Sequence, residues 1–146
     1  MGEAREVLDR MTAATMSNDT AALAACYAEG AVATAPGEDE IAGPEAISKF
    51  LSQMGQAFPD SAYEYLDKHE AGNVAIDEGY FTGTNTGPLV LPSGESAPPT
   101  GRELRLRVCD VARVEGGLIR SHHFYWDQME FLGQLGLLPA PDPGAL

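Results

Sequence analysis

Residues 103–126 read ELRLRVCDVARVEGGLIRSHHFYW, and this stretch decides the fold. Apolar and polar residues alternate on both sides of Gly116-Gly117, a pattern that predicts two antiparallel strands joined by a tight turn. Residues 61–70 and 74–84 have the same period of two, and Gly72-Asn73 separates them. We therefore expect a meander of four long antiparallel strands in the second half of the chain.

The first half of the chain has the period of a helix. Apolar residues three or four positions apart predict helices over residues 3–16, 20–29 and 44–58, with Gly30 ending the second. A short strand is expected at residues 31–35, an acidic turn at 36–40, and a long loop at 85–101. A helical turn is expected at 129–135. The Pro-rich residues 139–146 are expected to form a flexible tail after a single domain of residues 1–138.

Helices followed by antiparallel strands predict an α+β domain, in which three N-terminal helices pack on one face of a curved antiparallel sheet. A strongly curved sheet covered by helices encloses an apolar pocket, where we expect a ligand site.

The composition excludes several classes of function. The formal net charge is −13, from 22 acidic and 9 basic residues, so the chain lacks the basic face that nucleic acid requires. No apolar run reaches the ~20 residues of a membrane span, and the charged N-terminus lacks a signal core. We therefore expect a cytoplasmic protein that binds neither nucleic acid nor membrane. Cys26 and Cys109 lie in apolar stretches and are expected to be buried thiols. The nucleotide-binding motifs are absent, and nothing in the sequence calls for an organic cofactor.

The densest group of reactive side chains is SHHFYWDQ, residues 121–128. In a regular strand its alternate residues share a face: Ser121, His123, Tyr125 and Asp127 on one side, and His122, Phe124 and Trp126 on the other. Neighbouring histidines then point to opposite faces and cannot bind one ion, so we expect no metal site. Each histidine is either a packing residue or part of the site.

Two carboxylates are candidates for acid–base chemistry. In an apolar cavity Asp127 would have a raised pKa suited to a general acid or base; alternatively, it caps the helical turn that follows, with Glu130 at the capping-box position. Asp110 is either a cavity carboxylate or half of an ion pair with an arginine across the sheet. Of the adjacent Asp77 and Glu78, one faces inward. Aromatic residues are expected to form the cavity or core walls: Tyr63, Tyr65, Tyr80, Phe81 and Trp126.

Three segments carry a resemblance to a known family. They are GTNTGPL at residues 83–89, PPTGRELRLRVCDVARVEGGLI at 98–119, and HFYWDQMEFLGQLGLLP at 123–139. In these segments, and in IAGPEAISKFL at residues 41–51, the chain resembles the SnoaL-like ester cyclases of the nuclear transport factor 2-like superfamily. The resemblance covers about 140 residues and implies a cone-shaped half-barrel around the pocket.

The resemblance also implies an activity. Family cyclases close a polyketide ring by intramolecular aldol condensation without metal or cofactor, and an aspartate late in the last strand is the acid–base. Asp127, before Gln134-Leu135-Gly136, matches that position, and His122 matches the upstream histidine. His122 or His123 would then hold the enolate charge, and Tyr125 and Trp126 would shape the substrate slot.

The chain departs from the family pattern at two places. Asn85 stands where relatives often have the histidine of Thr-His-Thr-Gly, so it is expected at the substrate without the imidazole. His123-Phe124 stands where many cyclases have Trp-Asp, which removes a second carboxylate.

Three functions remain open. The first is a cyclase or isomerase with Asp127 as base. The second is an epoxide or lactone hydrolase in the same fold, with Asp110, Asp127 and either Arg105 or Arg107 around one water. The third is a non-catalytic module that binds a lipid or metabolite. In each case we expect a small apolar or aromatic ligand, and a homodimer, because the outer face of such a sheet retains apolar residues.

Overall fold

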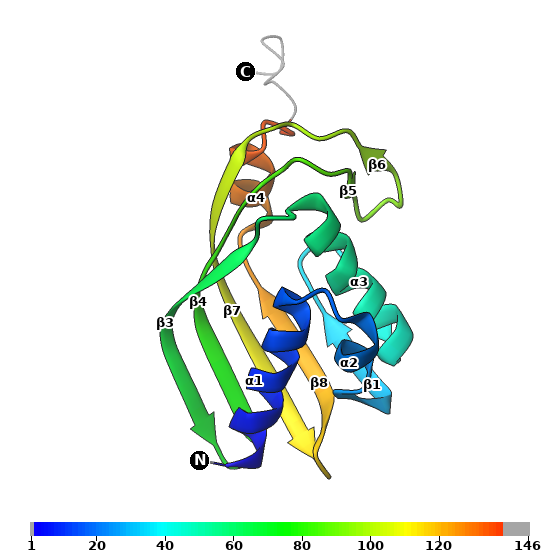
Figure 1. Ribbon diagram of the computed structural model, residues 1–146, viewed down its shortest axis with the longest axis vertical. Helices are drawn as coiled ribbons and strands as arrows, with labels where there is room; N and C mark the ends of the chain where they lie inside the picture. Colours follow the sequence, from blue (N-terminus) through cyan, green and yellow to red (C-terminus); the bar gives the residue numbers. More distant parts are fainter. Residues whose placement is uncertain (1, 139–146) are drawn as a thin grey trace, which may run out of the picture.

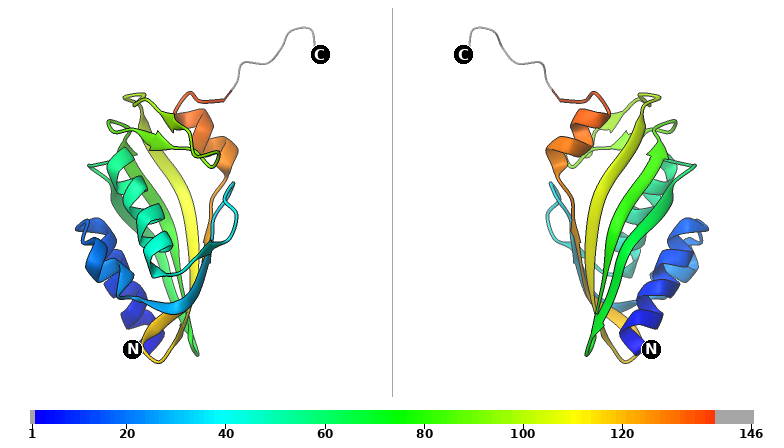
Figure 2. Two further views of the ribbon diagram at one scale, coloured as in Figure 1. Left: turned by 90° about the vertical axis from the view of Figure 1, so that its right-hand side faces the viewer. Right: turned by 90° about the vertical axis from the view of Figure 1, so that its left-hand side faces the viewer.

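A curved, six-stranded sheet with helices on its concave face forms the body of the computed structural model, which describes residues 2–138 (Figures 1 and 2). The tail expected at 139–146 lies outside the described residues. The helices are α1 (Glu3–Met16), α2 (Thr20–Ala24), α3 (Pro44–Ala57) and α4 (Gln128–Gln134). The strands are β1 (Tyr27–Thr34), β2 (Ile41–Ala42), β3 (Ala62–Ala71), β4 (Val74–Thr84), β5 (Leu89–Val90), β6 (Ser96–Ala97), β7 (Glu103–Glu115) and β8 (Leu118–Tyr125).

The strand order β2-β1-β8-β7-β4-β3 contains the expected meander of β3, β4, β7 and β8. The α+β prediction, with three N-terminal helices on a curved sheet, is confirmed. Register shifts between Tyr65 and Asp67, between Arg113 and Val114, and in β1 mark irregularities that bend the strands. The sheet is not wholly antiparallel, because β1 runs parallel to β8.

The helix predicted over residues 20–29 is wrong in its second half. Asp19 caps α2 by accepting from the Ala22 amide, but α2 ends at Ala24, and Tyr27 begins β1. The spacing of Leu23, Cys26 and Tyr27 fits a helix face, and pairing of β1 with β8 overrides it. Gly30 therefore lies within a strand instead of ending a helix.

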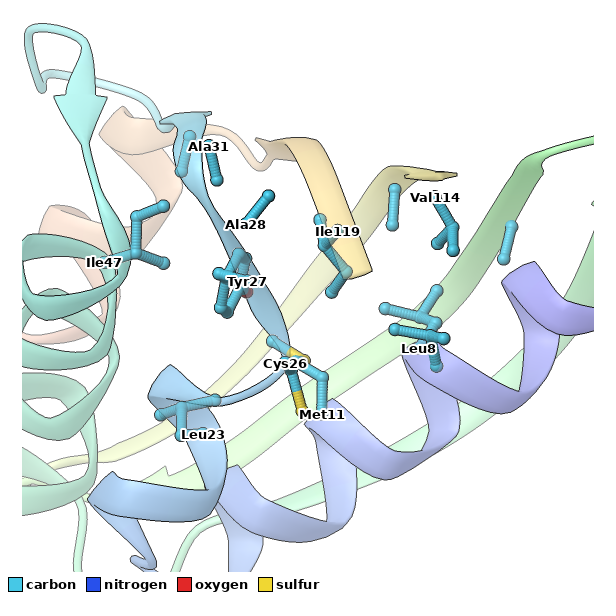
Figure 3. Close-up of a cluster of buried hydrophobic side chains, with 14 of the residues drawn as sticks. Leu8, Met11, Leu23, Cys26, Tyr27, Ala28, Ala31, Ile47, Val114 and Ile119 are labelled. Carbon is cyan, nitrogen blue, oxygen red and sulfur yellow. The ribbon is translucent and has the colours of Figure 1, made fainter. Parts of the chain in front are cut away.

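The main core lies between α1, α2 and the lower halves of the strands (Figure 3). Leu8 and Met11 of α1 meet Tyr27 and Ile119 there, and all four are buried. A second core lies at the other end of the sheet, where Phe131 of α4 packs near Phe58 with ring centroids 6.3 Å apart. No helix among the described residues is long and apolar enough to cross a membrane.

Candidate active site

A cavity of about 110 Å³ lies between the two cores, under α1 and α3. Side chains from α1, α3, β3, β4, β7 and the end of β8 line it, and most are apolar or aromatic. They include Phe50, Met54, Tyr63, Phe81, Phe124 and Trp126. The apolar pocket expected from the curved sheet is present.

Two carboxylates enter this cavity from neighbouring strands. Asp77 on β4 and Asp110 on β7 are directly opposite in the β4–β7 register, so both side chains project from the same face of the sheet. Asp77 is 1% exposed and Asp110 is 8% exposed. Of the adjacent pair Asp77 and Glu78, it is therefore Asp77 that faces inward.

Asp110 is held by a buried chain of hydrogen bonds. Its Oδ2 is 2.7 Å from Nε2 of His122, and Nδ1 of His122 is 2.7 Å from the hydroxyl of Tyr27. His122 is fully buried, and burial raises the pKa of Tyr27 well above its usual value, with the Asp110 charge adding to the effect. Because Tyr27 therefore stays neutral and donates to Nδ1, the N–H of the imidazole is assigned to Nε2, which donates to Asp110.

Asp77 is held differently, by an arginine from the first helix. Arg5 Nη2 lies 2.6 Å from Asp77 Oδ1 and also pairs with Asp9 on its own helix. Burial raises the pKa of Asp77, and the Asp110 charge acts in the same direction against the opposing charge of Arg5. Asp77 is therefore more readily protonated than an ordinary aspartate.

Tyr63 supplies a hydroxyl without a partner. Its oxygen is buried against the cavity, and within residues 2–138 it makes no hydrogen bond. Burial raises the pKa of Tyr63, and the negative charges of Asp110 and Asp77 raise it further. The Tyr63 hydroxyl therefore keeps its proton. The ring lies over Gly79, where an added Cβ would clash first with the backbone carbonyl oxygen of Glu64 and would also come within 2.9 Å of Tyr63 Cε1. The small residue thus makes room for the tyrosine in the cavity wall.

Asp127 does not lie in the cavity, and this corrects the role inferred from the resemblance. It is exposed and caps α4: Oδ1 accepts from the amides of Met129 and Glu130 at 2.9 and 3.2 Å. The chain leaves the sheet after Tyr125, so strand alternation no longer determines which way the Asp127 side chain points. The helix-capping alternative is confirmed.

Three further residues expected at the substrate lie on the outer face of the sheet. His123 and Tyr125 alternate outward from β8, with Tyr125 53% exposed and its hydroxyl 3.3 Å from His123 Nδ1. Tyr80 alternates outward from β4 and lies under the guanidinium of Arg105, 3.7 Å from its ring centroid. The side chain of Arg105 therefore lies on the outer surface of the sheet, as does that of Arg107. None of these side chains reaches the cavity.

Asn85 is fully buried, but it is a loop-holding residue outside the cavity. Its amide donates to the carbonyls of Ala57 and Gly87, and its Oδ1 accepts from the backbone and hydroxyl of Thr100. Trp126, by contrast, lines the cavity as expected.

The residues that sequence analysis missed are Tyr27, Arg5 and the free hydroxyl of Tyr63. Arg5 and Tyr27 lie far in sequence from their partners. Arg5 reaches Asp77 only through packing of α1, and Tyr27 reaches His122 only through pairing of β1 with β8. The one local signal in the sequence is the position of Arg5 on the core-facing side of α1. In the structure this arginine is 5% exposed. No three His, Cys, Asp or Glu side chains of residues 2–138 are grouped to hold a metal ion.

Comparison with known proteins gives the family. The family model described as SnoaL-like domain matches residues 8–122, so the chain belongs to the SnoaL-like family. The structure resembles a candidate SnoaL-like polyketide cyclase from a Jannaschia species, with TM-score 0.81, 15% identity, and coverage of 94% of both chains. No protein of curated function matches the sequence.

Two other solved structures have the same fold. One is a hypothetical protein with a ketosteroid isomerase-like fold from Catenulispora acidiphila, in complex with trimethylamine (TM-score 0.73, 18% identity, 93% of this chain and 98% of that one). The other is an LEH-like epoxide hydrolase from M. tuberculosis (TM-score 0.67, 18% identity, 92% and 90%). At these identities the likeness shows the fold.

Proposed function

We propose that the chain is an enzyme of the cyclase or isomerase type that moves protons to and from carbon on a small, largely apolar carbonyl compound. Asp110 is the general base and acid, and the protein's own residues carry the chemistry without a cofactor. The observation that carries the proposal is a carboxylate in an apolar cavity with one oxygen fixed by a buried histidine. Membership of the SnoaL-like family supports it.

The hydrogen-bond chain gives Asp110 a defined free oxygen. His122 holds Oδ2, and within the described part of the chain no group bonds to Oδ1. His122 and Tyr27 are thus positioning residues: they fix the carboxylate while Oδ1 meets the substrate. A general base must lie within hydrogen-bond reach of the proton that it removes, and fixing its orientation contributes to the rate.

Tyr63 would stabilise the charge that develops on the substrate. When Asp110 Oδ1 takes a proton from the carbon beside a carbonyl, the C–H electron pair moves into an enolate. The Tyr63 hydroxyl donates to the enolate oxygen. The enolate carbon then attacks a second carbonyl in the same molecule, and Asp110 returns its proton to the new alkoxide. Alternatively, where the enolate is conjugated with a carbon–carbon double bond, Asp110 returns the proton to a different carbon, which moves the double bond and gives isomerisation.

A deuterium-exchange assay, which does not require the natural substrate to be known, tests the proposal. A panel of cavity-sized β-keto esters and cyclic ketones is incubated in D₂O, and proton NMR follows exchange beside the carbonyl. We expect enzyme-dependent exchange for at least one compound and a loss of about 10²-fold or more in Asp110→Asn. Glu103→Gln, at an exposed position of the same strand, is the control. Exchange that survives in Asp110→Asn at the wild-type rate would refute Asp110 as the base.

A hydrolase is the second candidate, and the facing carboxylates support it. Beside Asp110, which was expected, Asp77 would take the place of Asp127, and Arg5 the place of Arg105 or Arg107. One carboxylate would activate water, and protonated Asp77 would donate to the leaving oxygen. The epoxide hydrolase with the same fold supports this option. Incorporation of ¹⁸O from water into a diol, for a panel of terminal epoxides, distinguishes it from proton transfer.

The neighbour in complex with trimethylamine supports a small-molecule ligand for this type of cavity. If ligands bind without exchange or hydrolysis, the chain is the binding module instead. The homodimer and the cytoplasmic location stay predictions.

A further inference from the structure

We propose that the ligand of this cavity is an organic cation: a protonated or quaternary amine carried on an apolar body. The inference rests on the proposed function only in that the substrate occupies this cavity. It names a substrate class that neither the family nor the reaction type implies, and three features of the lining support it.

The first feature is an excess of acceptors over donors. The carboxylates of Asp77 and Asp110 offer only acceptor atoms when ionised. Thr12 and Thr15 also line the cavity, but their hydroxyls donate their hydrogen atoms to the carbonyls of Leu8 and Met11 in the same helix. Both threonines therefore present oxygen lone pairs to a ligand, which complements an N–H donor or a positive charge.

The second feature is the absence of a competing cation from the lining. In the part of the chain that the structure describes, the cavity-lining residues include no lysine, arginine or histidine. Arg5 lies behind Asp77, where its Nη1 donates to the carbonyls of His69 and Ile76 and its Nε and Nη2 donate to Asp9. His122 lies behind Asp110 and is fully buried. An anionic ligand would meet two carboxylates with no positive group facing it.

The third feature is the aromatic wall, which attracts cations through the negative faces of its rings. Six aromatic side chains line the cavity: Phe50, Tyr63, Tyr65, Phe81, Phe124 and Trp126. The ring of Tyr65 already carries the ammonium of Lys68, 4.3 Å from its centroid, so the other five rings are the ones offered to a ligand. Rings around a carboxylate form the kind of site that binds alkylated ammonium groups, whose charge is spread over methyl groups and cannot be satisfied by hydrogen bonds alone.

The sheet register orders these features along the cavity. From the Asp77–Asp110 pair, the next inward pair is Gly79–Val108, and the next is Phe81–Leu106. The cavity is thus acidic at one end and apolar at the other, which fits an amine at one end of an apolar or aromatic body. The net charge of −13 would also raise the local concentration of cations around the protein.

A matched pair of ligands tests the inference. (3-Hydroxyphenyl)trimethylammonium and 3-tert-butylphenol have the same shape, and they differ in the charged nitrogen that replaces a carbon. Both are titrated into the wild-type protein by calorimetry at pH 6.5. We expect the cation to bind at least about tenfold more tightly than its neutral isostere, because cation–aromatic and carboxylate attraction act on it alone. Equal binding, tighter binding of the phenol, or no binding of either compound overturns the inference.

Two variants assign the selectivity to the cavity. Asp77→Asn removes one inward charge, and we expect the ratio of the two affinities to fall at least about threefold. Glu78→Gln removes the same charge from the next residue, which faces outward, and should leave the ratio unchanged. If Asp77→Asn fails to fold, Trp126→Leu provides the same test through the aromatic wall. Loss of the cation preference would leave the deuterium-exchange result intact, so this inference and the proposed function can fail separately.

Discussion

Replacing Asp127 with alanine distinguishes a helix cap from a catalytic residue. In the structure its carboxylate accepts two amide hydrogen bonds, from Met129 and Glu130, at the start of α4. Losing such a cap costs about 1 kcal/mol of stability, within a range of about 0.5–2 kcal/mol. For a chain of this length, 1 kcal/mol corresponds to a decrease in Tm of roughly 2–4 °C. Deuterium exchange per folded molecule should be unchanged.

The assay combines thermal unfolding by circular dichroism with the exchange measurement at a temperature well below the transition. Asp127→Ser is the matched control, because serine is also a good N-cap and should recover most of the lost stability. An exchange rate that falls more than tenfold in both variants, while Tm stays within a degree of wild type, would refute the placement of Asp127 outside the site. The cavity role implied by the resemblance would then stand.

Three further substitutions probe the cavity. Tyr63→Phe should slow exchange by about 10²-fold and leave Tm unchanged, since the lost hydroxyl has no partner in the described structure. Tyr27→Phe should shift the pH dependence of the exchange rate, because His122 loses the donor that fixes its tautomer; an unchanged pH profile would contradict the positioning role. Burial raises the pKa of Asp77, so the folded state holds a proton that the unfolded chain releases, and stability decreases as pH rises from about 4 through the folded-state pKa. In Asp77→Asn this decrease should be smaller, as measured by urea unfolding at pH 4.5 and 7.

The architecture was predictable because its signals are local. Period-two segments, glycine turns and the apolar stripes of residues 3–16 and 44–57 each specify an element, and a single packing arrangement satisfies them. The parallel pairing of β1 with β8 was not predictable in this way. Residues near Tyr27 fit both a helix face and a half-buried strand, and only contact with Ile119, about ninety positions away, selects the strand.

The site was predictable in part, for a related physical reason. Strand alternation correctly separated His122, Phe124 and Trp126 from His123 and Tyr125, although alternation alone cannot say which set faces the cavity. That choice depends on where the helices pack. The sequence left Asp110 as either a cavity carboxylate or the partner of an arginine across the sheet. In the structure it lies in the cavity, and its partner is a histidine. The contribution of Arg5 required knowing that α1 crosses the strand that holds Asp77.

The position of the inward carboxylate bears on how far the family's chemistry applies to this chain. The resemblance implies an acid–base late in the last strand, at Asp127, whereas the carboxylate held by His122 lies on the neighbouring strand, at Asp110. His122 holds Asp110 and is not among the described cavity-lining residues, so it does not take the enolate-binding role that the resemblance implied; its partner comes from the adjacent strand of the same sheet. A base on the neighbouring strand approaches the bound molecule from another direction, so it reaches a different carbon or the opposite face of the same carbon. We therefore expect the regiochemistry or stereochemistry of proton removal to differ from that of cyclases with the terminal aspartate, even where the same compound enters the cavity.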